Sequence, residues 1–141
     1  MLRIETRSSA ETEAAGADLA ARLEPGDVVA VTGELGSGKT TLIRGACRAL
    51  GVTDTVTSPT FTIGQLYRAR RGDAIFGVAH IDLYRLAELG KEDPALLDDY
   101  LTGDRIAFVE WPEVAGSLIA RPRARVHIEH LAGDRRRLEI S

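Results

Sequence analysis

The stretch Gly33-Glu34-Leu35-Gly36-Ser37-Gly38-Lys39-Thr40 fits the pattern G-x-x-x-x-G-K-[ST] at every position. Residues 28–31 before it are a short apolar run with the character of a buried strand, and residues 41–50 after it have the pattern of a helix. A phosphate-binding loop requires this order of strand, glycine-rich loop and helix. The stretch therefore predicts a nucleotide site within an α/β fold.

The glycines and the lysine of this loop indicate how it would hold phosphate. Glycine lets the backbone approach a ligand closely, so that successive N–H groups and the start of the following helix form an anion site. Lys39 is then expected to reach the β- and γ-phosphates, and the Thr40 hydroxyl to ligate Mg²⁺. The alternative is a glycine turn that carries a lysine by chance. Lysine is rare in this chain, where Lys39 and Lys91 are the two lysines among eighteen basic residues, and this disfavours the alternative.

The bulk composition bounds the class of protein. A chain of 141 residues has room for one hydrophobic core, so residues 1–141 are predicted to form a single domain. The hydrophobic and charged fractions, 44% and 28%, are those of ordinary folded proteins rather than disordered ones. The net charge of −3 provides no overall positive field for nucleic acid, so any RNA contact is expected to be local or through a partner.

Cysteine usage and hydropathy indicate the compartment. Cys47 is the single cysteine and cannot form an internal disulfide. It lies four residues after Ile43 on one helix face, which favours a buried packing role. The chain shows no signal peptide and no apolar stretch of about eighteen residues. A cytoplasmic protein without membrane contact is therefore expected.

Further strand and helix signals lie on both sides of the loop. Residues 2–6 alternate as a strand, and residues 8–11 have capping-box spacing for a helix that extends to about residue 23. Residues 93–101 begin with an Asp-Pro pair typical of a helix start. Residues 106–109 form an apolar run that predicts a buried strand.

Two antiparallel hairpins complete the predicted fold. A turn-like triplet separates residues 62–70 from residues 74–81, and another separates residues 124–131 from residues 135–140. We therefore predict one P-loop NTPase domain of the α/β class. Its central sheet should be mixed but mostly parallel, flanked by helices and carrying antiparallel hairpins.

Two acids follow predicted strands at the edge where open α/β sheets place their chemistry. Asp82 ends the segment that contains His80, and Glu110 follows residues 106–109. Four apolar residues and an acid form the Walker B pattern, here with glutamate where aspartate is commoner. Asp82 and Glu110 are both candidates to hold the metal or orient the attacking water, and the pattern does not assign these roles. His80 is predicted to be a hydrogen-bonded structural residue.

Three further positions each carry more than one interpretation. Thr60, in the loop after the first P-loop helix, is a candidate switch residue that senses the γ-phosphate, with a Ser-Pro turn as the alternative. Trp111 has three interpretations: it packs in the core, it lines the nucleotide site, or it contacts a partner protein. The basic run 135–137 is a contact to RNA, to nucleotide or to another subunit, or simply a solvated strand end, which the pattern favours.

Four motifs in this order resemble a known family. They are the loop 33–41, Ser58-Pro59-Thr60-Phe61, His80-x-Asp82-x-Tyr84-Arg85 and Glu110-Trp111-Pro112-Glu113. Together, over so short a chain, they resemble the TsaE family, also called YjeE, the small bacterial ATPases of tRNA threonylcarbamoyladenosine synthesis. Glu34 and Ser37 stand where this family frequently has aspartate and alanine.

The resemblance implies a function and a partner set. The protein would bind ATP and Mg²⁺ at the interface of TsaB- and TsaD-like subunits, which act on tRNA, and hydrolysis would reset that complex. The family pattern implies Lys39 on the phosphates, Thr40 and Glu110 on magnesium, and catalytic roles for Asp82, Glu110 and Thr60. The implied nucleotide contacts are Gly33, Glu34, Leu35, Gly36, Ser37, Gly38, Lys39, Thr40, Thr41, Asp82, Trp111, Ser9 and Arg135.

Two other functions share the phosphate-binding loop. A small metabolite kinase usually carries an arginine-bearing lid, whereas residues 86–103 are acidic and short. A nucleotide-gated binding module with negligible hydrolysis would use the same magnesium site. A GTPase is disfavoured because the chain contains no Asn-Lys-x-Asp motif.

Overall fold

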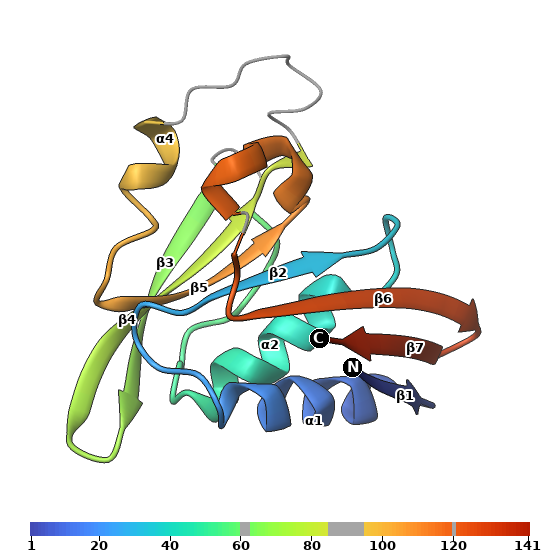
Figure 1. Ribbon diagram of the computed structural model, residues 1–141. Coiled ribbons are helices and arrows are strands. Elements are labelled where there is room, and N and C mark those ends of the chain that lie inside the picture. The colour runs from blue at the N-terminus through green and yellow to red at the C-terminus, as the bar shows by residue number, and fades with distance from the viewer. Residues whose placement is uncertain (60–62, 85–94, 120) are drawn as a thin grey trace.

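The computed structural model describes residues 1–59, 63–84, 95–119 and 121–141 (Figure 1). Thr60, Arg85, Asp93 and Pro94, which the sequence singled out, lie outside the described residues. The described chain forms a seven-stranded sheet with helices on both faces. Its strands are β1 (Leu2–Thr6), β2 (Val28–Thr32), β3 (Gly64–Arg71), β4 (Ala74–Asp82), β5 (Arg105–Glu110), β6 (Ala124–Ala132) and β7 (Arg135–Ile140).

The sheet is mixed, with a parallel centre and antiparallel edges. Its strand order is β1-β7-β6-β2-β5-β4-β3. The central strand β2 pairs in parallel with β5 on one side and β6 on the other, and β4 continues the parallel set beside β5. The hairpins β3–β4 and β6–β7 add antiparallel strands at the two sides, and β1 closes the sheet against β7. The predicted α/β fold with a mostly parallel centre is thereby confirmed.

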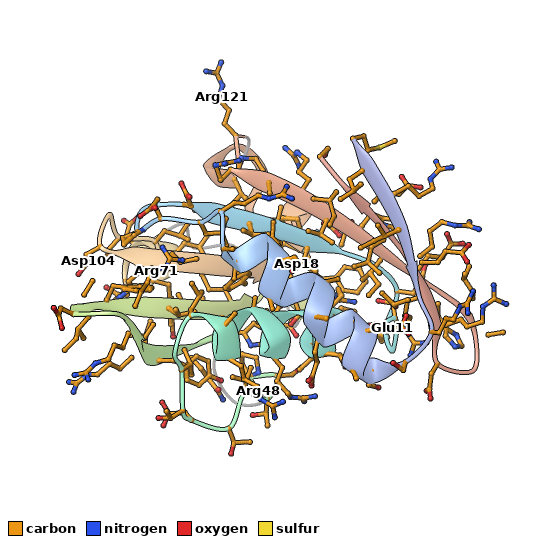
Figure 2. The ribbon with its side chains drawn as sticks, turned by 90° about the horizontal axis from the view of Figure 1, so that it is seen from below. Glu11, Asp18, Arg48, Arg71, Asp104 and Arg121 are labelled. Atoms are coloured by element: carbon orange, nitrogen blue, oxygen red, sulfur yellow. The ribbon has the colours of Figure 1, made fainter. Side chains whose placement is uncertain are left out.

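Two helices, α1 (Ser9–Ala20) and α2 (Lys39–Ala49), lie side by side on one face of the sheet (Figures 1 and 2). The alternation along β2 divides the core, since Val29 and Val31 pack toward these helices while Ala30 packs on the other face. That second face is covered by α4 (Ala95–Asp98) and the 3₁₀ segment η1 (Pro112–Ile119) (Figure 1). The parallel strands are therefore buried on both faces, as their continuous apolar runs predict.

The helix α1 begins as predicted but ends early. The Ser8 side chain accepts a hydrogen bond from the Glu11 amide at 3.1 Å, while the Glu11 carboxylate accepts one from the Arg7 amide at 3.0 Å, one residue before the cap. The helix ends at Ala20 rather than near residue 23 because the next turn tightens, with the Leu23 amide donating to the Ala20 carbonyl at 3.1 Å. Leu23 itself remains fully buried.

Several other boundaries differ from the sequence-based prediction. The short helix α4 ends at Asp98, before residue 101, where the Tyr100 and Leu101 amides both turn back to the Leu97 carbonyl. Strands β4 and β5 extend one residue further than predicted, so that Asp82 and Glu110 are their last residues.

Along the described ranges, none of the helices has the length and apolar character that crossing a lipid bilayer requires.

Candidate nucleotide-binding site

The glycine-rich loop connects the end of β2 to the start of α2, as the sequence predicts (Figure 1). Gly38 caps α2 with φ of 111°, a left-handed backbone that disfavours side chains. A Cβ atom at Gly33 would lie 2.4 Å from the Ile128 carbonyl oxygen, which leaves no space for another residue. The start of α2 has neither a side-chain cap nor an acid in its first turn, so its N–H groups can receive an anion.

Lys39 lies folded onto its own loop. Its Nζ atom donates to the carbonyl oxygens of Gly33 at 2.6 Å and Glu34 at 2.9 Å, and the side chain is only 5% exposed. Burial lowers the pKa of Lys39, while the carboxylates of Glu110 and Asp82 oppose that shift. The lysine is thus held close to the loop by weak acceptors that phosphate oxygens can replace.

Asp82 and Glu110 meet at the ends of two neighbouring parallel strands. They are register partners of β4 and β5, and both line the same cavity. Asp82 Oδ1 accepts a hydrogen bond from the Tyr84 amide at 3.0 Å. Burial raises the pKa of Asp82, the Tyr84 amide opposes the shift, and the charge of Glu110 adds to it. The two acids that the sequence analysis names as candidates therefore lie side by side at one cavity.

The loop after α2 is joined to the phosphate-binding loop by a hydroxyl pair. Thr40 Oγ1 and Ser58 Oγ lie 2.6 Å apart. This contact holds Ser58 beside the proposed magnesium ligand, two residues before the candidate switch residue Thr60. The Ser58–Thr40 hydrogen bond therefore connects residues 56–59 to the start of α2.

Trp111 follows Glu110 and forms a wall of the site. Its ring centroid lies 5.0 Å from Lys39 Nζ and 5.0 Å from the centroid of the Tyr84 ring. Its backbone has φ of 57°, unusual for a large residue and associated with functional sites. Trp111 thus lines the cavity and also packs against the second core cluster, so its interpretations as a cavity wall and as a core residue both remain open.

These side chains line an open cavity of about 280 Å³ beside the loop. The cavity brings together most of the predicted site residues and is lined by Leu35, Gly36, Gly38, Lys39, Thr40, Thr41, Ser58, Asp82, Glu110, Trp111 and Arg136. Gly33 and Glu34 do not line it, although their carbonyls accept hydrogen bonds from Lys39, which does. Ser37 is buried below the loop, where its hydroxyl lacks a hydrogen-bond partner among the described residues.

The two outlying candidates, Ser9 and Arg135, have different positions. Ser9 borders a small hollow of about 10 Å³ beside Gly38 and Thr41. Arg135 instead forms ion pairs with Glu5 of β1, with a 3.5 Å N–O distance. Its neighbour Arg136 lines both the hollow and the main cavity. The structure therefore places Arg136, and not Arg135, at the site.

The donor set at the cavity suits magnesium. Two carboxylates and the Thr40 hydroxyl supply the hard oxygen ligands that Mg²⁺ prefers. Among the described residues no group of three or more His, Cys, Asp or Glu side chains forms a closed metal site. Magnesium in nucleotide sites usually takes only one or two protein carboxylates and completes its shell with phosphate and water, so these residues fit the ion.

Three contacts at the site do not follow from the sequence pattern. Ser58 belongs to one of the four motifs, but its hydrogen bond with Thr40 depends on the path of the loop between them. Arg136 lay in the basic run 135–137, where strand alternation could have separated it from its neighbours. His80 was expected to be hydrogen-bonded, but its partner, Glu110, lies thirty residues away in the chain.

The chain is similar to several known proteins. The model of the family described as "Threonylcarbamoyl adenosine biosynthesis protein TsaE" matches residues 6–138. The tRNA threonylcarbamoyladenosine biosynthesis protein TsaE of Bacillus subtilis is 34% identical over 140 residues, covering 99% of this chain and 85% of that protein. Its namesake from Streptomyces coelicolor is 41% identical over 120 residues, covering 84% and 79%. The crystal structure of YdiB from Bacillus subtilis superposes with a TM-score of 0.75 at 30% identity, covering 97% and 82%.

Proposed function

The chain belongs to the TsaE family, and on that premise we propose that it is the ATP-binding and ATP-hydrolysing subunit of the machinery that makes N6-threonylcarbamoyladenosine in tRNA. The observation that carries the proposal is the cavity in which Lys39, Thr40, Asp82 and Glu110 converge. Residues 1–141 would act as one P-loop ATPase domain. The names of the relatives support the pathway, and the cavity supports the chemistry.

Binding of the triphosphate is assigned to the loop and to α2. Lys39 exchanges the Gly33 and Glu34 carbonyls for the β- and γ-phosphate oxygens, because charged oxygens are stronger acceptors. The open N–H groups at the start of α2 hold the same phosphates. Ser9 and Arg136, which border the hollow beside Gly38 and Thr41, would also contact the nucleotide. Arg135 is not assigned a contact, since Glu5 holds it at the edge of the sheet.

The metal and the water are assigned to the strand ends. Thr40 and Glu110 would hold Mg²⁺, which when bound neutralises the negative charge on the phosphate oxygens. Water would attack the γ-phosphorus. The bond between the γ-phosphorus and the β–γ bridging oxygen would then break, releasing ADP and inorganic phosphate. Asp82 or Glu110, which are register partners and line the same cavity, would orient that water. Thr60 would sense the γ-phosphate as a switch residue. Ser58, two residues before it, is hydrogen-bonded to Thr40.

The proposed partners are based on membership of the family and not on any feature of the protein surface. We propose that TsaB- and TsaD-like subunits bind the protein in the cytoplasm and that tRNA is reached only through them. The net charge of −3 agrees with an indirect role on tRNA. Hydrolysis would then reset the complex between turnovers.

The test is phosphate release from magnesium ATP by the purified protein, alone and with a TsaB–TsaD pair. We expect weak release alone and faster release with the pair, and no release by the Lys39→Ala variant in either case. Turnover that the pair leaves unchanged would contradict the partner role. Transfer of phosphate to a small molecule, without free phosphate, would favour the kinase alternative, and tight binding without release would favour the gated binding module.

A further inference from the structure

His80 is fully buried within the sheet, yet it reaches the candidate site through Glu110. It stands on β4 opposite Phe108 of β5, on the face of the sheet where Asp82 and Glu110 also lie. Its imidazole leans toward the strand end, and its Nε2 atom lies 2.6 Å from Glu110 Oε2. The two side chains are 0% and 4% exposed. A hydrogen bond this short between buried groups fixes the direction of the carboxylate.

The surroundings of the ring indicate which nitrogen carries the proton. Among the described residues Nδ1 of His80 has no hydrogen-bond partner, while Nε2 faces a carboxylate that can only accept when it is ionised. We therefore assign a proton to Nε2, which donates it in a hydrogen bond to Glu110.

From this geometry we propose that His80 is a positioning residue for Glu110. It holds one carboxylate oxygen, Oε2, so that the other remains for the cavity that Glu110 lines. The proposal rests on the proposed function, because it is the role of Glu110 toward Mg²⁺ or water that His80 would support. Residues that orient a metal-ligating group in this way commonly change metal affinity or activity by about 10- to 100-fold when they are replaced.

The pairing of Glu110 with Asp82 explains why an orienting donor is needed. The two carboxylates are register partners, so each repels the other in the absence of a cation. In the described part of the chain, His80 is the residue whose side chain donates a hydrogen bond to the Glu110 carboxylate. Without this donor the Glu110 side chain would be free to rotate away from Asp82 and out of the metal position.

Three replacements distinguish positioning from simple core filling. In His80→Gln the amide nitrogen reaches about as far as Nε2 and can still donate to Glu110, whereas in His80→Asn the amide ends near the place of Nδ1. His80→Leu fills the core without any donor. If His80 only fills the core, the leucine variant should keep the most activity. If His80 positions Glu110, the glutamine variant should keep the most.

The experiment measures ATP binding with and without Mg²⁺, together with kcat and KM for phosphate release. We expect the apparent Mg²⁺ affinity and kcat to fall by about tenfold in the asparagine and leucine variants and to be restored in the glutamine variant. Affinity for ATP without Mg²⁺ should be equal in all four proteins, which also shows that each has folded. Equal Mg²⁺ affinity in wild type and leucine variant, or equal losses in asparagine and glutamine variants, would overturn the proposal.

A second measurement works on the ligand-free protein. Long-range ¹H–¹⁵N correlation spectra of histidine-labelled protein should show His80 with the proton on Nε2, and Glu110→Gln should shift that Nε2 signal. A proton on Nδ1 would overturn the inference whatever the activity. A wild-type protein that binds no magnesium ATP would instead refute the proposed function, and the role of His80 toward it would fail for that reason.

Discussion

Asp82 and Glu110 stand directly opposite each other at the ends of β4 and β5, so that two carboxylates face one cavity. Like charges at opposed positions destabilise a sheet unless a cation lies between them. Lys39 supplies part of this compensation, since both acids act on its pKa. Burial is the main cause of the raised pKa of Asp82, and the charge of Glu110 adds to it. This arrangement is expected where a protein reserves a position for a metal ion.

Replacing Asp82 by asparagine should therefore stabilise the ligand-free protein while slowing hydrolysis. Because the folded-state pKa of Asp82 is raised, the native state binds its proton more tightly than the unfolded state, and stability declines as pH rises through that folded-state pKa. The advantage of Asp82→Asn over wild type should thus be present at neutral pH and shrink on acidification. Urea midpoints without nucleotide or magnesium measure it. Asp18→Asn, at an exposed acid of α1 (Figure 2), is the control, and a lower midpoint for Asp82→Asn would contradict the expectation.

Lys39→Ala should separate binding from folding. Hydrogen bonds to charged groups contribute about 1.5–3 kcal/mol, so loss of the lysine should weaken ATP binding by about tenfold or more. The fold should remain, since among the described residues the hydrogen bonds of Nζ go to two carbonyls of its own loop, and burial already lowers the pKa of Lys39. Calorimetric titration with ATP and thermal unfolding measure the two effects. Loss of cooperative unfolding in the variant would show that Lys39 has a structural role instead.

Trp111 should report nucleotide binding by its fluorescence. It is the only tryptophan of the chain, and its ring lies 5.0 Å from Lys39 Nζ. If Lys39 moves to the phosphates when ATP binds, the charge next to the indole moves with it, and the emission should change. Titrating ATP into wild type should give a saturable signal, and the same titration of Lys39→Ala should give a much weaker one. Binding seen by calorimetry without any change in emission would place the nucleotide away from Trp111.

The sequence was sufficient for the fold because its strongest signals are local. The glycine-rich loop between a strand and a helix is contiguous, as are the turns of the hairpins β3–β4 and β6–β7. The contact between His80 and Glu110 is not local, since it joins two strands by a diagonal across the sheet. Periodicity places each residue on a face, but it does not give the register between strands.

The position of Arg136 shows the same limit on a smaller scale. Successive side chains of a strand point to opposite faces, so an error of one residue moves a candidate from one surface to the other. Arg135 pairs with Glu5 of β1, and Arg136 turns toward the nucleotide cavity. An irregularity in the pairing of β6 with β7 lies beside this point, between His130 and Ala132, but along β7 the alternation holds, since Arg137 also pairs with Glu5.

Cys47 should be chemically silent in the folded protein. Burial raises the pKa of its thiol to about 12. An aromatic disulfide reagent at about pH 8 should therefore label the thiol, the only one in the chain, only after unfolding. The unfolded thiol, with its ordinary pKa, loses its proton first as pH rises, so this group lowers the stability of the fold between about pH 9 and 12. Stoichiometric labelling of the native protein within minutes would show that the thiol is accessible.

The packing of α1 against α2 should control the nucleotide site through two glycines. A Cβ atom at Gly16 would lie 2.1 Å from the Leu42 carbonyl oxygen, and one at Gly45 would lie 2.0 Å from the Glu13 carbonyl oxygen. Alanine gains about 1 kcal/mol over glycine in a helix, but overpacking against backbone atoms typically costs 1–3 kcal/mol, and these contacts leave no flexible side chain to yield. Gly16→Ala and Gly45→Ala should therefore lower the free energy of unfolding.

The same two variants should also weaken ATP binding, because α2 begins at Lys39 and Thr40 and any displacement of the helix moves both residues. Gly103→Ala is the matched control, since a Cβ atom there meets no atom within 4 Å among the described residues. Chemical denaturation gives the change in stability, and calorimetry gives the affinity at a temperature where every variant is folded. If Gly16→Ala and Gly45→Ala lost stability but bound ATP as wild type does, the phosphate-binding loop would be independent of the helix pair.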